Sequence, residues 1–390
     1  MMLAHALPVT ATLAEYEAQA AALFTAYQAG NPQALQIFGN LHPRFLDPTV
    51  TWKPLFASND EIIAAALTAD DARLAVARRY SFADWEALVS LVTAVADEGS
   101  PVHRFELAAE AVVDGDLATL RRLLAVDPAL VHVRSTRVTS QDPPVHGATL
   151  LHYVAANGVE GYRQRSPGNA IDVATMLLDA GADVNALAQM YGGDCATLPM
   201  LMSSTPPFET GVQVPLVHLL LDRGASLDGV GQSDWQSPVR TALLFGFVDA
   251  AAAVVARGAT VDSLEIAAGL GNIAMVRTRL PAAGEAERHS AFALAAHNDR
   301  VDVCALLLEA GADPNAFNPK GMHDHATPLH GACGSGYVRL AALLLSRGAR
   351  LDIRDRLWDG TPRDWAEHGG QWEIIGLLDA HEAHDVDQGG

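Results

Sequence analysis

Two histidines separated by a single residue, His323 and His325, lie in a loop with the sequence GMHDH at 321–325. On an extended segment, residues i and i+2 point to the same face, so both imidazoles could reach one metal ion or one substrate. A carboxylate such as Asp194 would complete a metal site of two nitrogens and one oxygen. Alternatively, the pair could act with Asp194 and Tyr191 in proton transfer to a bound small molecule, or recognise a ligand or partner by polar contacts alone.

Other loops contain residues of similar chemistry, in the runs MYGGDC at 190–195, SDW at 233–235 and LWDG at 357–360. If these loops stack side by side, their side chains point toward one groove. The residues that we predict to bind a ligand or partner there are His146, Tyr191, Asp194, Trp235, His323, Asp324, His325, Trp358 and Asp359. For the two tryptophans, the alternative is packing between adjacent loops. Cys195 could be a nucleophile beside an imidazole, but no local Cys-His signature supports this role, and we expect an idle thiol.

A two-helix unit follows the GMHDH loop, within residues 301–352. Thr327 and Pro328 provide a side-chain cap and a proline at the first helical position, which together predict a helix start. A second helix is predicted from about Val338 and ends at Gly348, which can adopt the left-handed conformation of a helix terminus. Neither helix could bury its apolar face alone, so the unit must stack on copies of itself.

Copies of this unit recur along the chain. A Gly-Ala pair ends a predicted helix at Gly181, Gly224, Gly258, Gly311 and Gly348. The run TPLH at 327–330, followed by LLLSRGARLD, closely resembles the ankyrin repeat family. The resemblance implies an all-α ankyrin-repeat solenoid of about eight repeats over residues 105–380. It also implies that His152 and His330 hydrogen-bond to backbone between loops.

Several loops are longer than this resemblance requires. The helix-starting threonine lies 14 positions after the aspartate both from Asp183 to Thr197 and from Asp313 to Thr327, about four more than in an ordinary repeat of the family. We therefore predict extended finger loops. Two further insertions, at 159–169 and 203–212, separate the two helices of their repeats and could form a rim.

Residues 1–100 are predicted to form a separate helical segment. Its runs AYQAGNPQAL and ARRYSFADWEALV resemble the helical leader found ahead of some bacterial ankyrin-repeat proteins. This resemblance implies an N-terminal cap for the solenoid, and a binding role for the segment is the alternative.

Composition narrows the function classes. The formal net charge is -20, and no basic run exceeds two residues, which argues against binding to a nucleic-acid backbone. Three scattered cysteines are too few for a disulfide framework and indicate a reducing compartment. No stretch has the length and apolarity of a membrane span, so we expect a cytoplasmic protein that does not bind membranes.

Two functions remain open from the sequence. The first, which we favour, is a binding protein that recognises a protein segment or small molecule through its concave face and extended fingers, without a cofactor. The second is an enzyme whose fingers roof the groove into a pocket, with His323, His325, Asp194 and Tyr191 as catalytic groups and His323 and His325 as ligands if a metal is present. Fold alone cannot separate them, because function depends on the site.

Overall fold

The computed structural model describes residues 6–49, 53–156, 158–190, 193–230 and 237–389. The chain divides into two compact units, residues 1–236 and 237–390. The boundary predicted at residues 100–105 lies inside the first unit, where its sixth α-helix begins at Pro101. The division into a capping segment and a solenoid stays a prediction. The predicted residues Tyr191 and Trp235 lie outside the described residues. No helix in the described ranges is both long and apolar enough to cross a membrane.

Helices dominate the first unit. Its helices are α1 (Leu13–Gln28), α2 (Pro32–Leu41), α3 (Asn59–Ala64), α4 (Ala69–Arg79), α5 (Trp85–Ala96), α6 (Pro101–Asp114), α7 (Leu117–Val126), α8 (Leu150–Val154), α9 (Ala170–Asp179), α10 (Thr197–Leu201), α11 (Thr205–Glu209) and α12 (Gln213–Asp222). Short 3-10 helices occupy η1 (Pro43–Phe45), η2 (Pro128–His132) and η3 (Gly161–Arg163). The strands β1 (Ala188–Met190) and β2 (Gly193–Cys195) pair antiparallel, so the long finger after Gly181 is a small hairpin.

The second unit continues the two-helix pattern. Its helices are α13 (Pro238–Leu244), α14 (Val248–Ala256), α15 (Leu264–Gly269), α16 (Ile273–Arg279), η4 (Leu280–Ala282), α17 (Glu285–His297), α18 (Val301–Glu309), α19 (Pro328–Ser335), α20 (Val338–Ser346), α21 (Pro362–His368) and α22 (Trp372–Gly389).

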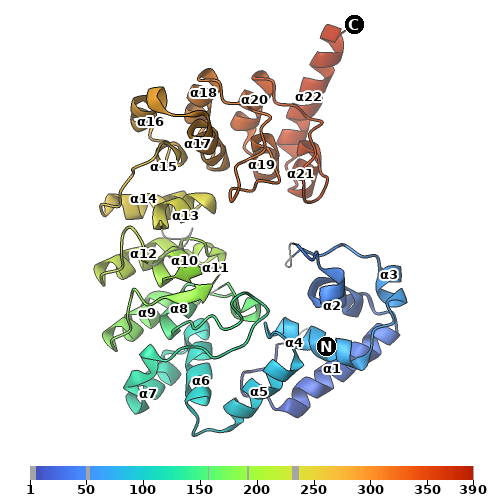
Figure 1. The fold of residues 1–390 in the computed structure, drawn as a ribbon, viewed down its shortest axis with the longest axis vertical. Coiled ribbons are helices and arrows are strands. Elements are labelled where there is room, and N and C mark those ends of the chain that lie inside the picture. The colour runs from blue at the N-terminus through green and yellow to red at the C-terminus, as the bar shows by residue number, and fades with distance from the viewer. Residues whose placement is uncertain (1–5, 50–52, 157, 191–192, 231–236, 390) are drawn as a thin grey trace. The chain divides into compact units, whose positions relative to one another are not determined.

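Within each unit the repeats stack as two rows of helices (Figure 1). In the first unit α6 packs on α8 and α8 on α10, while α7 packs on α9 and α9 on α12. In the second unit α15, α17, α19 and α21 form one row, and α16, α18, α20 and α22 form the other. The all-α solenoid predicted from the sequence is confirmed, and the number of repeats stays a prediction.

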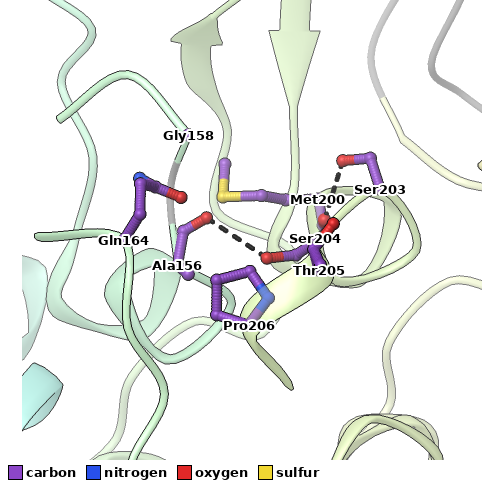
Figure 2. Close-up of a pocket in the computed structure, with 8 residues that line it drawn as sticks. All are labelled: Ala156, Gly158, Gln164, Met200, Ser203, Ser204, Thr205 and Pro206. Atoms are coloured by element: carbon purple, nitrogen blue, oxygen red, sulfur yellow. Dashed lines mark hydrogen bonds between the residues drawn. The ribbon is translucent and has the colours of Figure 1, made fainter. Parts of the chain in front are cut away.

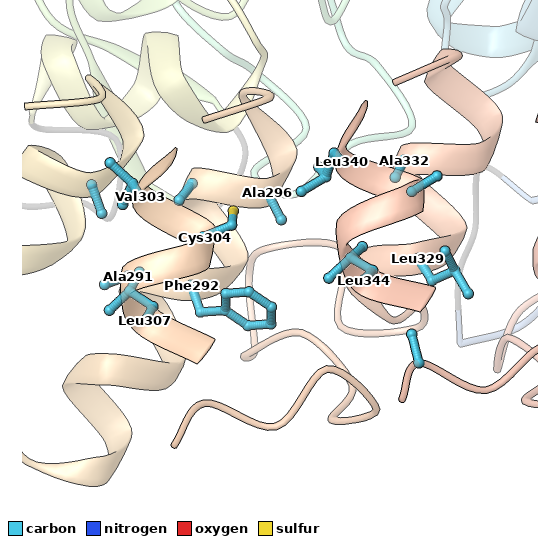
Figure 3. Close-up of a cluster of buried hydrophobic side chains, with 14 of the residues drawn as sticks. Ala291, Phe292, Ala296, Val303, Cys304, Leu307, Leu329, Ala332, Leu340 and Leu344 are labelled. Carbon is cyan, nitrogen blue, oxygen red and sulfur yellow. The ribbon is translucent and has the colours of Figure 1, made fainter. Parts of the chain in front are cut away.

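Small and branched apolar side chains fill the space between stacked helix pairs. In the second unit Phe292, Leu307, Leu329 and Leu344 are almost fully buried, and Figure 3 shows them among their neighbours. Alanines on the same helices, such as Ala332, allow the close approach of neighbouring repeats. This packing explains why the sequence pattern repeats, because each helix buries its apolar face on the next pair.

The first five helices, α1 to α5, share a core of their own. Tyr80 ties it together: its hydroxyl donates to Gln19 Oε1 at 3.0 Å and accepts from the Leu7 amide at 2.8 Å. Helix α5 then packs against α6, where the repeats begin.

Candidate functional site

Five aromatic side chains of the second unit gather where two fingers meet the ends of their helices. We call them the histidine–tryptophan cluster: His297, His323, His325, Trp358 and Trp365. The His297 and His323 rings stack with centroids 5.1 Å apart, and the His325 ring lies 5.9 Å from that of His323. His325 in turn meets Trp358 edge-on at 5.1 Å and Trp365 at 5.8 Å. The structure therefore brings together three residues predicted for the groove and two that the sequence did not indicate.

The loop that carries the two histidines is a compact turn and not the extended segment assumed from the sequence. His323 has a φ of 58°, in the left-handed region that few residues other than glycine adopt. The Asn318 amide N–H donates to the Ala326 carbonyl at 2.9 Å, and the Ala326 N–H donates to the His323 carbonyl at 3.0 Å. Met322 in the same loop is buried, with 6% of its surface exposed. The two imidazoles thus come together because the loop folds into a turn, and not because residues i and i+2 of an extended segment share a face.

Asp355 shapes the next finger and holds Trp358 and Trp365 in place. Its Oδ1 accepts the backbone N–H groups of Leu357 and Trp358 at 2.8 and 2.7 Å. Its Oδ2 accepts the Gly360 N–H at 2.9 Å and the Trp365 indole N–H at 3.0 Å. Burial raises the pKa of Asp355, but these donors outweigh it and hold the pKa below its usual value.

The two fingers are joined by Arg356. Its backbone N–H donates to the His325 carbonyl at 2.8 Å, and its Nη1 donates to the Asp324 carbonyl at 3.3 Å. The guanidinium carbon lies 3.9 Å from the ring centroid of Phe317, at the start of the finger that carries His323 and His325. The fingers therefore form one surface, on which Trp358 keeps 45% of its area exposed.

The imidazoles of the cluster favour the neutral state. Burial, helped by the neighbouring His323 ring, lowers the pKa of His297 to about 4. Loss of solvent around the ring lowers the pKa of His323, and the same effect together with His323 lowers that of His325. At pH 7 the cluster is thus an uncharged aromatic surface beside the exposed acids Asp324 and Asp359.

The two finger histidines have few polar partners among the described residues. Within the described residues neither His323 nor His325 hydrogen-bonds to a carboxylate, and the buried Nε2 of His325 has no hydrogen-bond partner. The described part of the chain also places no three His, Cys, Asp or Glu side chains as a group that could hold a metal ion. Asp194, in strand β2, accepts a hydrogen bond from the Gln189 side chain. Its combination with the two histidines stays a prediction.

Two other predicted or considered side chains of the first unit are buried. His146 is 1% exposed, and its Nε2 lies 3.0 Å from Glu160 Oε1, so it faces the interior and not a groove. Cys195 is also buried, and burial raises the pKa of its thiol to about 12. A thiol that stays protonated at pH 7 is a poor nucleophile.

His146 belongs to a buried ion network that the sequence did not reveal. Arg163, in the inserted segment at 159–169, pairs with Glu106 at 2.8 Å, Glu110 at 2.7 Å and Glu160 at 2.9 Å. Arg137, in the first finger of the chain at residues 134–147, pairs with Glu106 at 2.7 Å and lies 4.4 Å from the Phe82 ring centroid. The network joins α6, the first finger, the insertion and the N-terminal helices. The only sequence signal was the presence of arginines in the finger at 134–147 and in the insertion at 159–169.

Comparison with known proteins finds ankyrin repeats in both units of the chain. A family model of three ankyrin repeats matches residues 264–355, and a single ankyrin repeat matches 146–189. Cyclin-dependent kinase inhibitor 2A of Homo sapiens is 35% identical over 131 residues, which cover 26% of this chain and 83% of that protein. The chain belongs to the ankyrin-repeat family. Whether it is of the bacterial type stays a prediction.

Other relatives share shorter stretches with this ankyrin-repeat protein. Cyclin-dependent kinase inhibitor 2A of Monodelphis domestica is 37% identical over 78 residues, 20% of this chain and 43% of the relative. Cyclin-dependent kinase 4 inhibitor B of Homo sapiens is 38% identical over 76 residues, 20% of this chain and 52% of the relative. The chain thus spans about half the length of these two proteins. The potassium channel GORK of Arabidopsis thaliana is 36% identical over 78 residues, 20% of this chain and 9% of the channel.

The repeat histidines behave as the ankyrin resemblance implies. His330 Nε2 lies 3.2 Å from the Gly360 carbonyl of the next finger, and its Nδ1 contacts the Thr327 hydroxyl at 2.8 Å. His152 Nε2 lies 3.2 Å from the Cys195 carbonyl, with Nδ1 at 2.9 Å from the Thr149 hydroxyl. Both histidines link successive repeats, so their structural role is confirmed.

Proposed function

We propose that this ankyrin-repeat protein binds a protein partner through its fingers, and that the histidine–tryptophan cluster is a principal contact. The observation that carries the proposal is Trp358. Almost half of its surface is open to solvent, while its ring is braced edge-on by His325 and Trp365, the latter at 5.9 Å. A large aromatic that is held rigid before binding loses little conformational entropy on contact, and such residues dominate binding energies at protein interfaces.

The polar surroundings of the cluster suggest the chemistry of the partner. The neutral imidazoles and the exposed Asp324 and Asp359 favour a segment that offers apolar area together with hydrogen-bond donors or a basic side chain. The formal net charge of -20 would favour approach of such a segment at low salt.

The relatives support binding without specifying its target. Three are named as inhibitors of cyclin-dependent kinases and another as a potassium channel, so proteins with different names share the repeats. What they have in common with this chain is the scaffold, and sites on a scaffold vary independently of it. The enzyme alternative has less support, because in the described part of the chain the buried Nε2 of His325 has no hydrogen-bond partner, and no carboxylate accepts a hydrogen bond from either finger histidine to orient it as acid or base.

The proposal can be tested with a pair of tryptophan variants. Trp358→Ala removes the exposed cluster residue, whereas Trp372→Ala removes a tryptophan that is 77% exposed at the start of α22. We expect a partner captured by the wild-type chain and then purified to bind Trp358→Ala at least tenfold more weakly, since hot-spot truncations cost about 2 kcal/mol or more. Binding to Trp372→Ala should be unchanged. Equal affinities for wild type and Trp358→Ala would contradict the assignment of the cluster.

A further inference from the structure

The first unit contains a pocket at a place that the repeats do not require. It has a volume of about 330 Å³ and is lined on one side by Ala156, Gly158 and Gln164 and on the other by Met200 and residues 203–206 (Figure 2). Gln164 lies in the insertion at 159–169, and residues 203–206 belong to the insertion at 203–212. Both insertions separate the two helices of a repeat, and together they build the pocket walls.

The walls are fixed by interactions that extend well beyond the pocket. Gln164 directly follows Arg163 of the buried ion network, and its Nε2 donates to the Glu160 carbonyl at 3.3 Å. On the opposite side, buried Gln213 donates from its Nε2 to the carbonyls of Leu201 and Ser204 at 3.0 and 3.4 Å. The buried ion network therefore holds the Gln164 wall of the pocket in place before any ligand binds.

Three polar side chains that line the pocket, those of Gln164, Ser203 and Ser204, present hydrogen-bond acceptors. The Ser203 hydroxyl donates to the Met200 carbonyl at 2.9 Å, and the Ser204 hydroxyl donates to the Ala156 carbonyl at 3.5 Å. The lone pairs of both hydroxyl oxygens can then accept hydrogen bonds from a ligand. Gln164 uses its amide nitrogen on the Glu160 carbonyl, and Figure 2 shows its amide oxygen directed toward Ala156. Met200 adds an apolar, polarisable surface among these acceptors.

None of the described residues that line the pocket has an ionisable side chain. An ionic ligand would therefore lose hydration without gaining an opposite charge, which is unfavourable. A ligand with several O–H or N–H donors on a small carbon frame would satisfy the acceptors and place its C–H groups on Met200. The volume lies at the lower end of small-molecule sites, which span about 300–1,000 Å³.

We propose that this pocket binds a small uncharged polyol, such as a neutral monosaccharide or cyclitol. The two insertions supply the acceptors, and the buried ion network presets their spacing. The site is independent of the partner-binding role proposed for the fingers of the second unit.

The experiment measures saturation transfer from the full chain to D-glucose, D-galactose and myo-inositol, with gluconate and glucosamine as charged counterparts. We expect transfer to at least one neutral polyol and little to either charged analogue. Ser203→Ala, which removes one acceptor, should weaken binding about five- to tenfold. Thr205→Trp, at an exposed position on the pocket rim, should abolish the signal by filling the space.

Ser346→Ala is the matched control. The Ser346 hydroxyl donates to the carbonyl three residues earlier, as Ser203 does, but it lies in the second unit. Thermal unfolding of each variant establishes that it is folded. The proposal is overturned if no neutral polyol receives saturation, or if the charged analogues bind as tightly as the neutral ones. It is also overturned if the folded variants Thr205→Trp and Ser203→Ala bind the polyol like wild type.

Discussion

Asp355 is the residue on which the geometry of the finger proposed to bind a partner depends. Its carboxylate accepts four N–H groups, including the indole of Trp365 and the backbone of Trp358. Asp355→Ala leaves these donors without a partner in a site that is 3% exposed, so we expect the free energy of unfolding to fall by about 2–4 kcal/mol. Urea titration followed by tryptophan fluorescence measures the loss. Asp324→Ala, at an exposed carboxylate of the neighbouring finger, should change it by less than about 0.5 kcal/mol; a similar loss in both variants would refute the role of Asp355.

At the residue scale the sequence indicated the cluster only in part. His323 and His325 were recognisable because an inserted loop has no structural need for imidazoles. His297 was not, since it ends a helix 26 positions before His323 and meets it only through stacking of successive repeats. The role of Asp355 was hidden for another reason. An aspartate in a loop is common, and its four donors converge only when the turn has formed.

The helices were more predictable than the loops between them. The start of helix α19 at Pro328 was predictable from the threonine cap and the proline. The end of the next helix, α20, was predictable from Gly348, which adopts a φ of 83°. These signals are local. The finger at 321–326 was predicted as extended, but it folds into a turn because Asn318 bonds across it and Met322 is buried beneath it. Such contacts depend on the surrounding structure and leave no periodic pattern.

The insertion at 159–169 is held by the buried ion network, and this makes a prediction for that element. Arg163→Ala would leave Glu106 and Glu160 buried with one fewer cation, and removal of one member of a buried pair costs about 3–5 kcal/mol. Arg165→Ala removes the same side chain two positions later, where the guanidinium is 42% exposed and pairs with Glu110 and Asp114. The Arg165→Ala substitution should lower the free energy of unfolding by about 1 kcal/mol or less. Chemical denaturation of the two variants measures the difference, and equal losses would show that the network does not hold the insertion.

At the scale of the whole molecule, repetition made the fold predictable and the function difficult to read. Each repeat buries its helices on the next, so the conserved spacing of Gly-Ala pairs and helix starts reports stacking. The candidate sites lie where repeats depart from that spacing: one long finger, at 313–327, brings His323 and His325 to the cluster, and two insertions form the pocket. Sequence alone located these departures but not the atoms that meet there.

Acid should destabilise both units through histidines that are buried as neutral rings. Burial lowers the pKa of His152 and of His297 to about 4, whereas an unfolded chain has imidazoles near 6.5. Between these values the unfolded state binds more protons than the folded state, so stability is complete above about pH 6.5 and falls as the pH decreases toward 4. The loss approaches about 3 kcal/mol for each histidine at the lower limit. Urea midpoints measured at pH 7.5, 6, 5 and 4.5 should fall steadily, and His297→Gln should show a shallower dependence than wild type by about one proton. A wild-type midpoint that is the same at pH 7.5 and 5 would contradict the burial of neutral imidazoles.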